Sequence, residues 1–269
     1  MFTVVVRQER LRPFCRNLKL SYEEKCGIRY AVLAIKNKRK MNWSRIRAML
    51  GKAAGKVIFE QGIVPPPGSG IVPLDSSRYS QRLMYNGLSR MLSFHKEEAL
   101  QKTAVLVDLN CRYQSFANLL VHYFKMVRII TRDCEVYRYY IDQKLYECGA
   151  AVTVAAPGGP IGDSISLFVS PNGVILPSMK RSPVPIVVSE HSGDDSDAAS
   201  RIFCSFRAAM PNFYRELCRS GVDGHLLQAA LFECCGIPEF SAIMPDRLFA
   251  CGEWRTLSPA VPLFFLDNI

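Results

Sequence analysis

The sequence lacks the features that mark membrane and secreted proteins. No window approaches the ~18 uninterrupted apolar residues that a membrane-spanning helix needs. The opening stretch MFTVVVRQERLRPFCR also lacks the long apolar core of a secretory signal. The chain has 269 residues, 49% of them hydrophobic, which is enough to bury a full core. We therefore expect a folded cytoplasmic protein with no membrane segment.

Metal-ligating patterns are missing as well. Ten cysteines are present, but none of them form a C-x-x-C pair, and no histidine stands at ligand spacing from a cysteine, so no metal site is expected. The cysteines are scattered along the chain and do not have the spacing of a small disulfide-bonded protein. This distribution favours reduced thiols. The adjacent Cys234 and Cys235 could bind a soft metal or act in redox chemistry. Free cysteines are usually buried, however, and we interpret this pair as core residues.

Positive charge is concentrated in the first part of the chain. The formal net charge is +10. Residues 1–102 contain 20 Lys and Arg against 7 Asp and Glu, whereas residues 103–269 contain 14 against 17. Such a basic segment is a candidate surface for an acidic protein, a nucleic acid or a phosphorylated ligand. An ordinary solvated face rich in lysine would explain the same counts.

Residues 1–74 are predicted to form a small basic α/β unit. Its expected strands are short β-branched runs at residues 2–6, 28–35 and 56–60. Apolar residues at helical spacing between Trp43 and Leu50 indicate a helix. A proline- and glycine-rich turn at residues 65–70 closes the unit. A helix with one apolar face is then expected to connect it, over residues 75–102, to the next domain.

Residues 103–191 alternate apolar runs with helical patterns. Strands are expected at residues 103–108, 127–131, 150–155, 165–170 and 184–189. Helices follow the first two strands, with Asn110 and Asp133 as their expected N-caps. Strands joined by helices pair in parallel through right-handed crossovers. The pattern predicts a Rossmann-like doubly wound parallel sheet, followed by a mainly helical C-terminal region, residues 192–269, that packs on it.

Three consecutive segments, DSISLFVS, PNGVIL and VPIVVS, carry a resemblance to a known family. In dinucleotide-binding domains of the shikimate dehydrogenase and glutamyl-tRNA reductase type, a fourth strand that begins with an acidic residue is followed by a turn of small residues, an apolar segment and a fifth strand. The three segments have the same order here. Residues 103–190 resemble that type in the order and spacing of their elements. The resemblance implies an NAD(P)-binding fold, with NAD or NADP as the cofactor.

The glycine motif of that family is absent. Aligning VLVDLNCRYQ with a strand followed by G-x-G-x-x-G places Leu109, Cys111 and Gln114 at the three glycine positions. The glycines allow a tight turn and close approach of the backbone to the pyrophosphate. Side chains at all three positions are expected to obstruct a dinucleotide in its usual pose, so the motif gives no support for NAD or NADP.

Five residues after the first two strands are candidates for binding a phosphate-bearing ligand. Backbone N–H groups near Asn110 and Cys111 do not need glycine to attract an anion, and Arg112 could add a charged contact. Arg132 stands where a 2′-phosphate would be bound, and Asp133 where a ribose hydroxyl would be. A solvated turn position for Arg132 and a capping role for Asp133 explain these two residues without a ligand.

Cys111 is also the candidate catalytic residue. It and Cys134 each stand at a predicted helix N-terminus, where thiol pKa values fall and thiolates become reactive. A nucleophile also needs a base, and His122 lies three turns along the same helix, out of reach of Cys111.

Two hypotheses for the function follow. The first is a degenerate nucleotide- or phosphate-binding or interaction module that is not an enzyme and that uses its basic N-terminal unit to contact a partner. The alternative is an NAD(P)-dependent oxidoreductase with an atypical cofactor loop. The three filled glycine positions favour the first, although a fold does not by itself decide a function.

Overall fold

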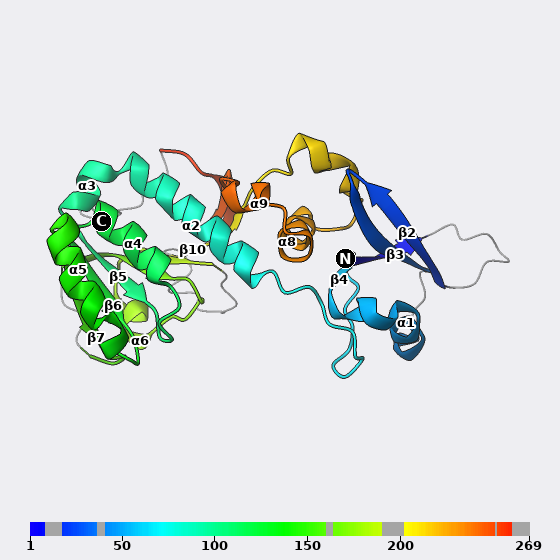
Figure 1. Ribbon diagram of the computed structural model, residues 1–269, viewed down its shortest axis with the longest axis horizontal. Coiled ribbons are helices and arrows are strands. Elements are labelled where there is room, and N and C mark those ends of the chain that lie inside the picture. The colour runs from blue at the N-terminus through cyan, green and yellow to red at the C-terminus, as the bar shows by residue number, and fades with distance from the viewer. Residues whose placement is uncertain (9–17, 37–40, 160–163, 190–201, 251, 260–269) are drawn as a thin grey trace. The chain divides into compact units, whose positions relative to one another are not determined.

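The computed structural model divides the chain into two compact units (Figure 1). The N-terminal unit comprises residues 1–79 and 209–242, and the Rossmann-like unit comprises residues 80–208 and 243–269. The structure describes residues 1–8, 18–36, 41–159, 164–189, 202–250 and 252–259.

The N-terminal unit contains a four-stranded sheet in the order β2-β3-β1-β4. Its strands are β1 (Thr3–Gln8), β2 (Leu18–Lys25), β3 (Ile28–Lys36) and β4 (Val57–Phe59). β1 pairs in parallel with β3 and β4, and β2 pairs antiparallel with β3. The three strands expected from the sequence are present. The fourth, β2, was not expected, because its sequence LKLSYEEK lacks an apolar run.

Helical elements complete the N-terminal unit. They are α1 (Trp43–Leu50), η1 (Gly51–Gly55), η3 (Asn212–Leu217), α8 (Gly224–Cys235) and α9 (Glu239–Ala242). The helix α1 begins at Asn42, whose side chain accepts a hydrogen bond from the N–H of Arg45 at 2.9 Å. Its buried Ile46 and Leu50 join Val5 and Leu33 of the sheet in one hydrophobic cluster. One face of this sheet is therefore covered by α1.

The Rossmann-like unit contains an eight-stranded sheet in the order β12-β11-β10-β9-β8-β5-β6-β7. Its strands are β5 (Thr103–Val107), β6 (Met126–Ile130), β7 (Ala151–Ala155), β8 (Ile165–Ser170), β9 (Ile186–Val188), β10 (Ile202–Arg207), β11 (Arg247–Ala250) and β12 (Glu253–Thr256). From β7 to β10 all neighbours pair in parallel. Numbered from β5, these six strands follow the order 3-2-1-4-5-6, which is that of the Rossmann fold. The predicted doubly wound α/β architecture is confirmed.

The helical elements that lie wholly or mostly in this unit are α2 (Ser77–Phe94), α3 (Lys96–Leu100), α4 (Gln114–Tyr123), η2 (Glu135–Tyr137), α5 (Arg138–Cys148) and α6 (Pro177–Arg181). The predicted inward stripe of α4 is largely present, since Phe116, Leu119, Leu120 and Tyr123 are buried. In α5 the buried side chain is Tyr140, whereas Leu145 is exposed. None of the helices in the described ranges has the length and apolar character that crossing a membrane requires.

The C-terminal region differs from the expectation for residues 192–269. It contributes three strands, β10 to β12, to the large sheet rather than being mainly helical. Its residues 209–242, expected to pack on the Rossmann-like domain, group with the N-terminal unit. The grouping depends on contacts between segments far apart in sequence, such as the hydrogen bond from the Lys25 ammonium to the Glu216 carbonyl. Local sequence patterns contain no information on such contacts.

Replacing Gly87 of α2 by alanine is expected to destabilise the protein, although alanine favours helix. An added Cβ would lie 2.6 Å from Cδ1 of Phe206 and 2.9 Å from Cγ of Pro245. Overpacking of this kind costs about 1–3 kcal/mol, more than the ~1 kcal/mol that alanine gains over glycine in a helix. Urea unfolding should show a lower midpoint. The control is Gly224→Ala in α8, where a Cβ meets nothing within 4 Å; equal midpoints for both variants would contradict the expectation.

Candidate functional site

The candidate site lies at the carboxyl ends of β5 and β6. In open parallel sheets this edge is where ligands bind. We call residues 108–113, which connect β5 to α4, the β5 turn. Its first residue, Asp108, directly follows the apolar strand TAVLV and is fully buried. A carboxylate in that position needs hydrogen-bond donors around it, because burying an unpaired charge is costly.

The donors come from the turn itself and from a tyrosine beyond β6. One oxygen of Asp108 accepts the N–H of Arg112 at 2.9 Å, and the other accepts the N–H of Tyr113 at 2.7 Å. The hydroxyl of Tyr137 donates to that second oxygen at 2.5 Å. Asp108 thereby bonds the N–H groups of the two residues that immediately precede α4, of which Tyr113 is the N-cap residue.

This arrangement corrects the predicted cap. Asn110 was expected to cap the helix, but α4 begins at Gln114 and its N-cap position, Tyr113, makes no side-chain capping bond. The carboxylate of Asp108 bonds the N–H groups instead, and Asn110 lies exposed in the turn. A residue six positions before the helix takes this role because the chain folds back at the end of β5.

Cys111 has the backbone conformation of a glycine. Its φ is +54°, in the left-handed region that side chains rarely adopt, at the position of the second glycine of the missing motif. Its sulfur lies 3.1 Å from the hydroxyl oxygen of Thr131 and 3.5 Å from the carbonyl oxygen of Asp133. Because α4 begins at Gln114, Cys111 precedes the helix and is not its first residue. Neither of its two contacts is with a group that could act as a base. Its catalytic role stays a prediction.

The turn after β6 holds the other two candidates. The N–H of Arg132 donates to the carbonyl of Leu109 at 3.4 Å, which joins this turn to the β5 turn. The carboxylate of Asp133 accepts the N–H of Glu135 at 3.2 Å, at the start of η2. This contact is the capping role that was the alternative to ligand binding for Asp133. The side chains of Arg112 and Arg132 are exposed, and their contact with a phosphate stays a prediction.

Sequence reasoning missed the residues that organise the site. Asp108, Thr131 and Tyr137 are all buried there, and none was among the candidates. An acidic residue at the end of an uninterrupted apolar strand was the available signal for Asp108. Thr131 and Tyr137 gave no such signal, because their roles depend on the pairing of β5 with β6.

Tyrosine ionisation is disfavoured in this cluster. Burial raises the pKa of Tyr137, and its hydrogen bond to Asp108 and the charge of that carboxylate raise it further. Burial also raises the pKa of Tyr113, with a smaller contribution from Asp108. Tyr137 therefore remains a neutral donor at physiological pH, as a bond to a carboxylate requires.

The chain matches no protein-family model and no curated protein. Among solved structures it is similar to L-tryptophan dehydrogenase from Nostoc punctiforme, with 14% identity over 80% of this chain and a TM-score of 0.39. It spans 63% of the length of that protein. It is also similar to quinate dehydrogenase from Corynebacterium glutamicum in complex with NAD, with 13% identity and a TM-score of 0.31. This similarity covers 81% of this chain and 86% of the quinate dehydrogenase chain. The similarity to a lysine cyclodeaminase covers 45% of this chain and 37% of the cyclodeaminase chain, with 14% identity and a TM-score of 0.27.

Replacing Asp108 by alanine is expected to destabilise the protein strongly. The change leaves two backbone N–H groups and the Tyr137 hydroxyl without their acceptor. The expected loss is about 3 kcal/mol, since each unsatisfied buried donor costs on the order of 1–3 kcal/mol. Asp133→Ala removes one exposed capping contact and should cost about 1 kcal/mol. A melting temperature for Asp108→Ala at or above that of Asp133→Ala would show that the carboxylate does not hold the turn.

Proposed function

We propose that this chain is a Rossmann-like binding or interaction module whose phosphate-binding turn is closed by its own carboxylate. It does not bind a dinucleotide in the usual pose. The observation that carries the proposal is the pair of hydrogen bonds from the N–H groups of Arg112 and Tyr113 to Asp108. In dinucleotide-binding domains the corresponding N–H groups at the start of the helix hold the pyrophosphate.

Electrostatics support the same reading. A pyrophosphate placed over the β5 turn would have to displace a buried carboxylate from its donors or lie beside its negative charge. Like charges at short range repel strongly where water is excluded. The side chains of Leu109, Cys111 and Gln114 stand at the three glycine positions of the motif, which adds a steric obstacle.

The binding capacity that remains at this edge lies with arginines. Arg112 and Arg132 are exposed on turns that follow neighbouring parallel strands. They could hold a phosphorylated small molecule or a nucleotide by charge alone, without a backbone cradle. We propose that the basic N-terminal unit contacts an acidic partner, either a protein or a nucleic acid. Seven cysteines in the described ranges are free thiols, in keeping with a reducing compartment such as the cytoplasm.

A thermal-shift and NMR titration tests the proposal. NAD and NADP are each expected to leave the melting temperature unchanged, whereas a ligand at 100 times its Kd would stabilise the protein by ~2.7 kcal/mol. The backbone amide signals of Arg112 and Tyr113 should stay in place, because their N–H groups remain bonded to Asp108. A rise in melting temperature with NAD or NADP, together with movement of these two signals, would overturn the proposal in favour of the oxidoreductase.

A further inference from the structure

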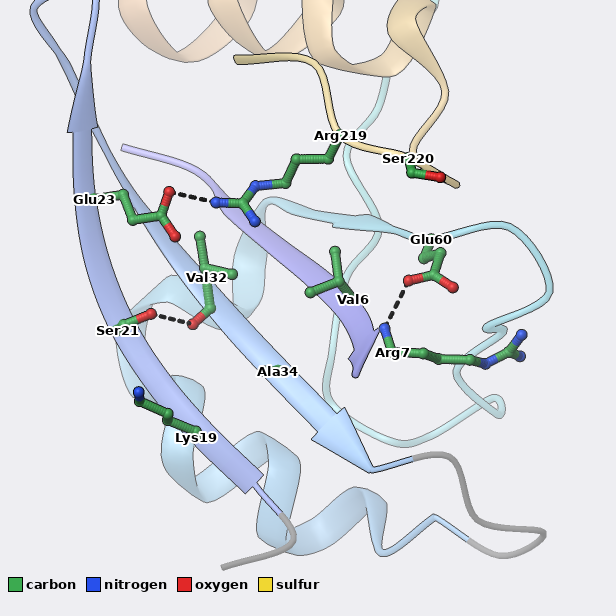
Figure 2. Close-up of a pocket in the computed structure, with 10 residues that line it drawn as sticks. All are labelled: Val6, Arg7, Lys19, Ser21, Glu23, Val32, Ala34, Glu60, Arg219 and Ser220. Atoms are coloured by element: carbon green, nitrogen blue, oxygen red, sulfur yellow. Dashed lines mark hydrogen bonds and ion pairs between the residues drawn. The ribbon is translucent and has the colours of Figure 1, made fainter. Parts of the chain in front are cut away.

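A polar pocket lies on the N-terminal sheet (Figure 2). Its volume is about 370 Å³. Alternate residues of β2, Lys19, Ser21 and Glu23, line it, while Leu18 and Leu20 pack with the cluster that contains α1. Because side chains alternate across a strand, the pocket lies on the sheet face opposite α1.

Small side chains make this face hollow. Tyr30, Val32 and Ala34 follow one another at alternate positions of β3. The large ring of Tyr30 is buried against Phe2, with 5.5 Å between the ring centroids. Further along the strand Val32 and Ala34 fill less space, and with Val6 of β1 they form an apolar floor. Figure 2 shows the segment that carries Arg219 and Ser220 bordering the pocket.

One ion pair fixes the cation at the edge of the pocket. The guanidinium of Arg219 bonds the carboxylate of Glu23, which also accepts the hydroxyl of Tyr30 at 3.0 Å. Burial alone would raise the pKa of Glu23, but the bonds from Arg219 and Tyr30 outweigh it and lower the pKa. The guanidinium also lies over the Tyr30 ring, 5.9 Å from its centroid. Arg219 is thus held in place before any ligand arrives.

The second acid of the pocket is also occupied. Glu60 accepts the backbone N–H of Arg7 at 2.6 Å, and the guanidinium of Arg7 donates to the carbonyl of Gly62 at 2.6 Å. Figure 2 shows the Arg7 side chain directed away from the pocket, so the cations of the lining are Lys19 and Arg219. The Nε of Arg219 is buried and has no acceptor among the described residues. Neither acid of the lining bonds the exposed Lys19 ammonium, from whose N–H groups an anionic ligand would accept hydrogen bonds.

We propose that this pocket binds a small molecule bearing a carboxylate or phosphate group, with the anionic oxygens held between Lys19 and Arg219. The hydroxyls of Ser21 and Ser220 contact its other polar atoms, and its carbon skeleton lies on the apolar floor. The volume is near the lower end of the ~300–1,000 Å³ typical of ligand pockets, which suits a small metabolite. The site is independent of the β5 turn and of the function proposed for it.

Titration with defined anions tests this site. Succinate and citrate serve as carboxylate probes, and inorganic phosphate and glycerol 3-phosphate as phosphate probes, all at constant ionic strength. At least one probe is expected to shift the amide signals of Ser21, Val32 and Ser220 in a saturable way. Saturation by one class alone identifies that group as the ligand chemistry, and saturation by both supports a general anion site. No saturable shift at about 10 mM, ten times a millimolar Kd, would overturn the proposal.

Two matched lysine variants separate a built site from general attraction of anions. Lys19→Gln is expected to weaken the bound probe at least fivefold. Lys52→Gln removes the same charge from η1, outside the pocket lining, and should leave the affinity unchanged. Neither exposed lysine is in the core, so both variants should fold. Equal weakening by the two variants would refute a specific role for Lys19 and with it the proposed site.

Discussion

The buried carboxylate of Asp108 is the interaction on which the Rossmann-like unit's site depends. Its three donors come from the β5 turn and from Tyr137 beyond β6, so one side chain ties two neighbouring strand ends together. A buried charge is tolerated only when such donors surround it. The bonds that stabilise the turn also occupy the N–H groups of Arg112 and Tyr113.

The sequence predicted the sheet better than the site. Uninterrupted apolar runs such as TAVLV identify buried parallel strands, and right-handed crossovers then limit their order. The cap at α4 was mispredicted because Asn110 is the nearest residue of capping type, whereas the actual acceptor, Asp108, reaches the N–H groups only after the turn folds. The polar strand β2 and the placement of residues 209–242 likewise depend on tertiary contacts.

The two polar sites differ in what they leave unsatisfied. At the β5 turn the acceptor is fully bonded and the exposed charges belong to Arg112 and Arg132. In the N-terminal pocket the acids are bonded while Arg219 retains a buried donor without an acceptor. A buried donor without an acceptor costs stability. The fold therefore predicts less about ligand binding here than the hydrogen bonds of each site do.

Cys111 shows why the turn can keep its shape without a ligand. A non-glycine residue in the left-handed region costs on the order of 1 kcal/mol, yet φ at Cys111 is +54°. Two contacts offset that strain: its N–H donates to the carbonyl of Asp108 at 3.3 Å, and its thiol lies 3.1 Å from the hydroxyl of Thr131. The conformation is thus imposed by the passage from β5 to α4 and held by the protein's own groups. A glycine-like backbone at this position is therefore a property of the strand-to-helix connection and does not by itself indicate a bound dinucleotide.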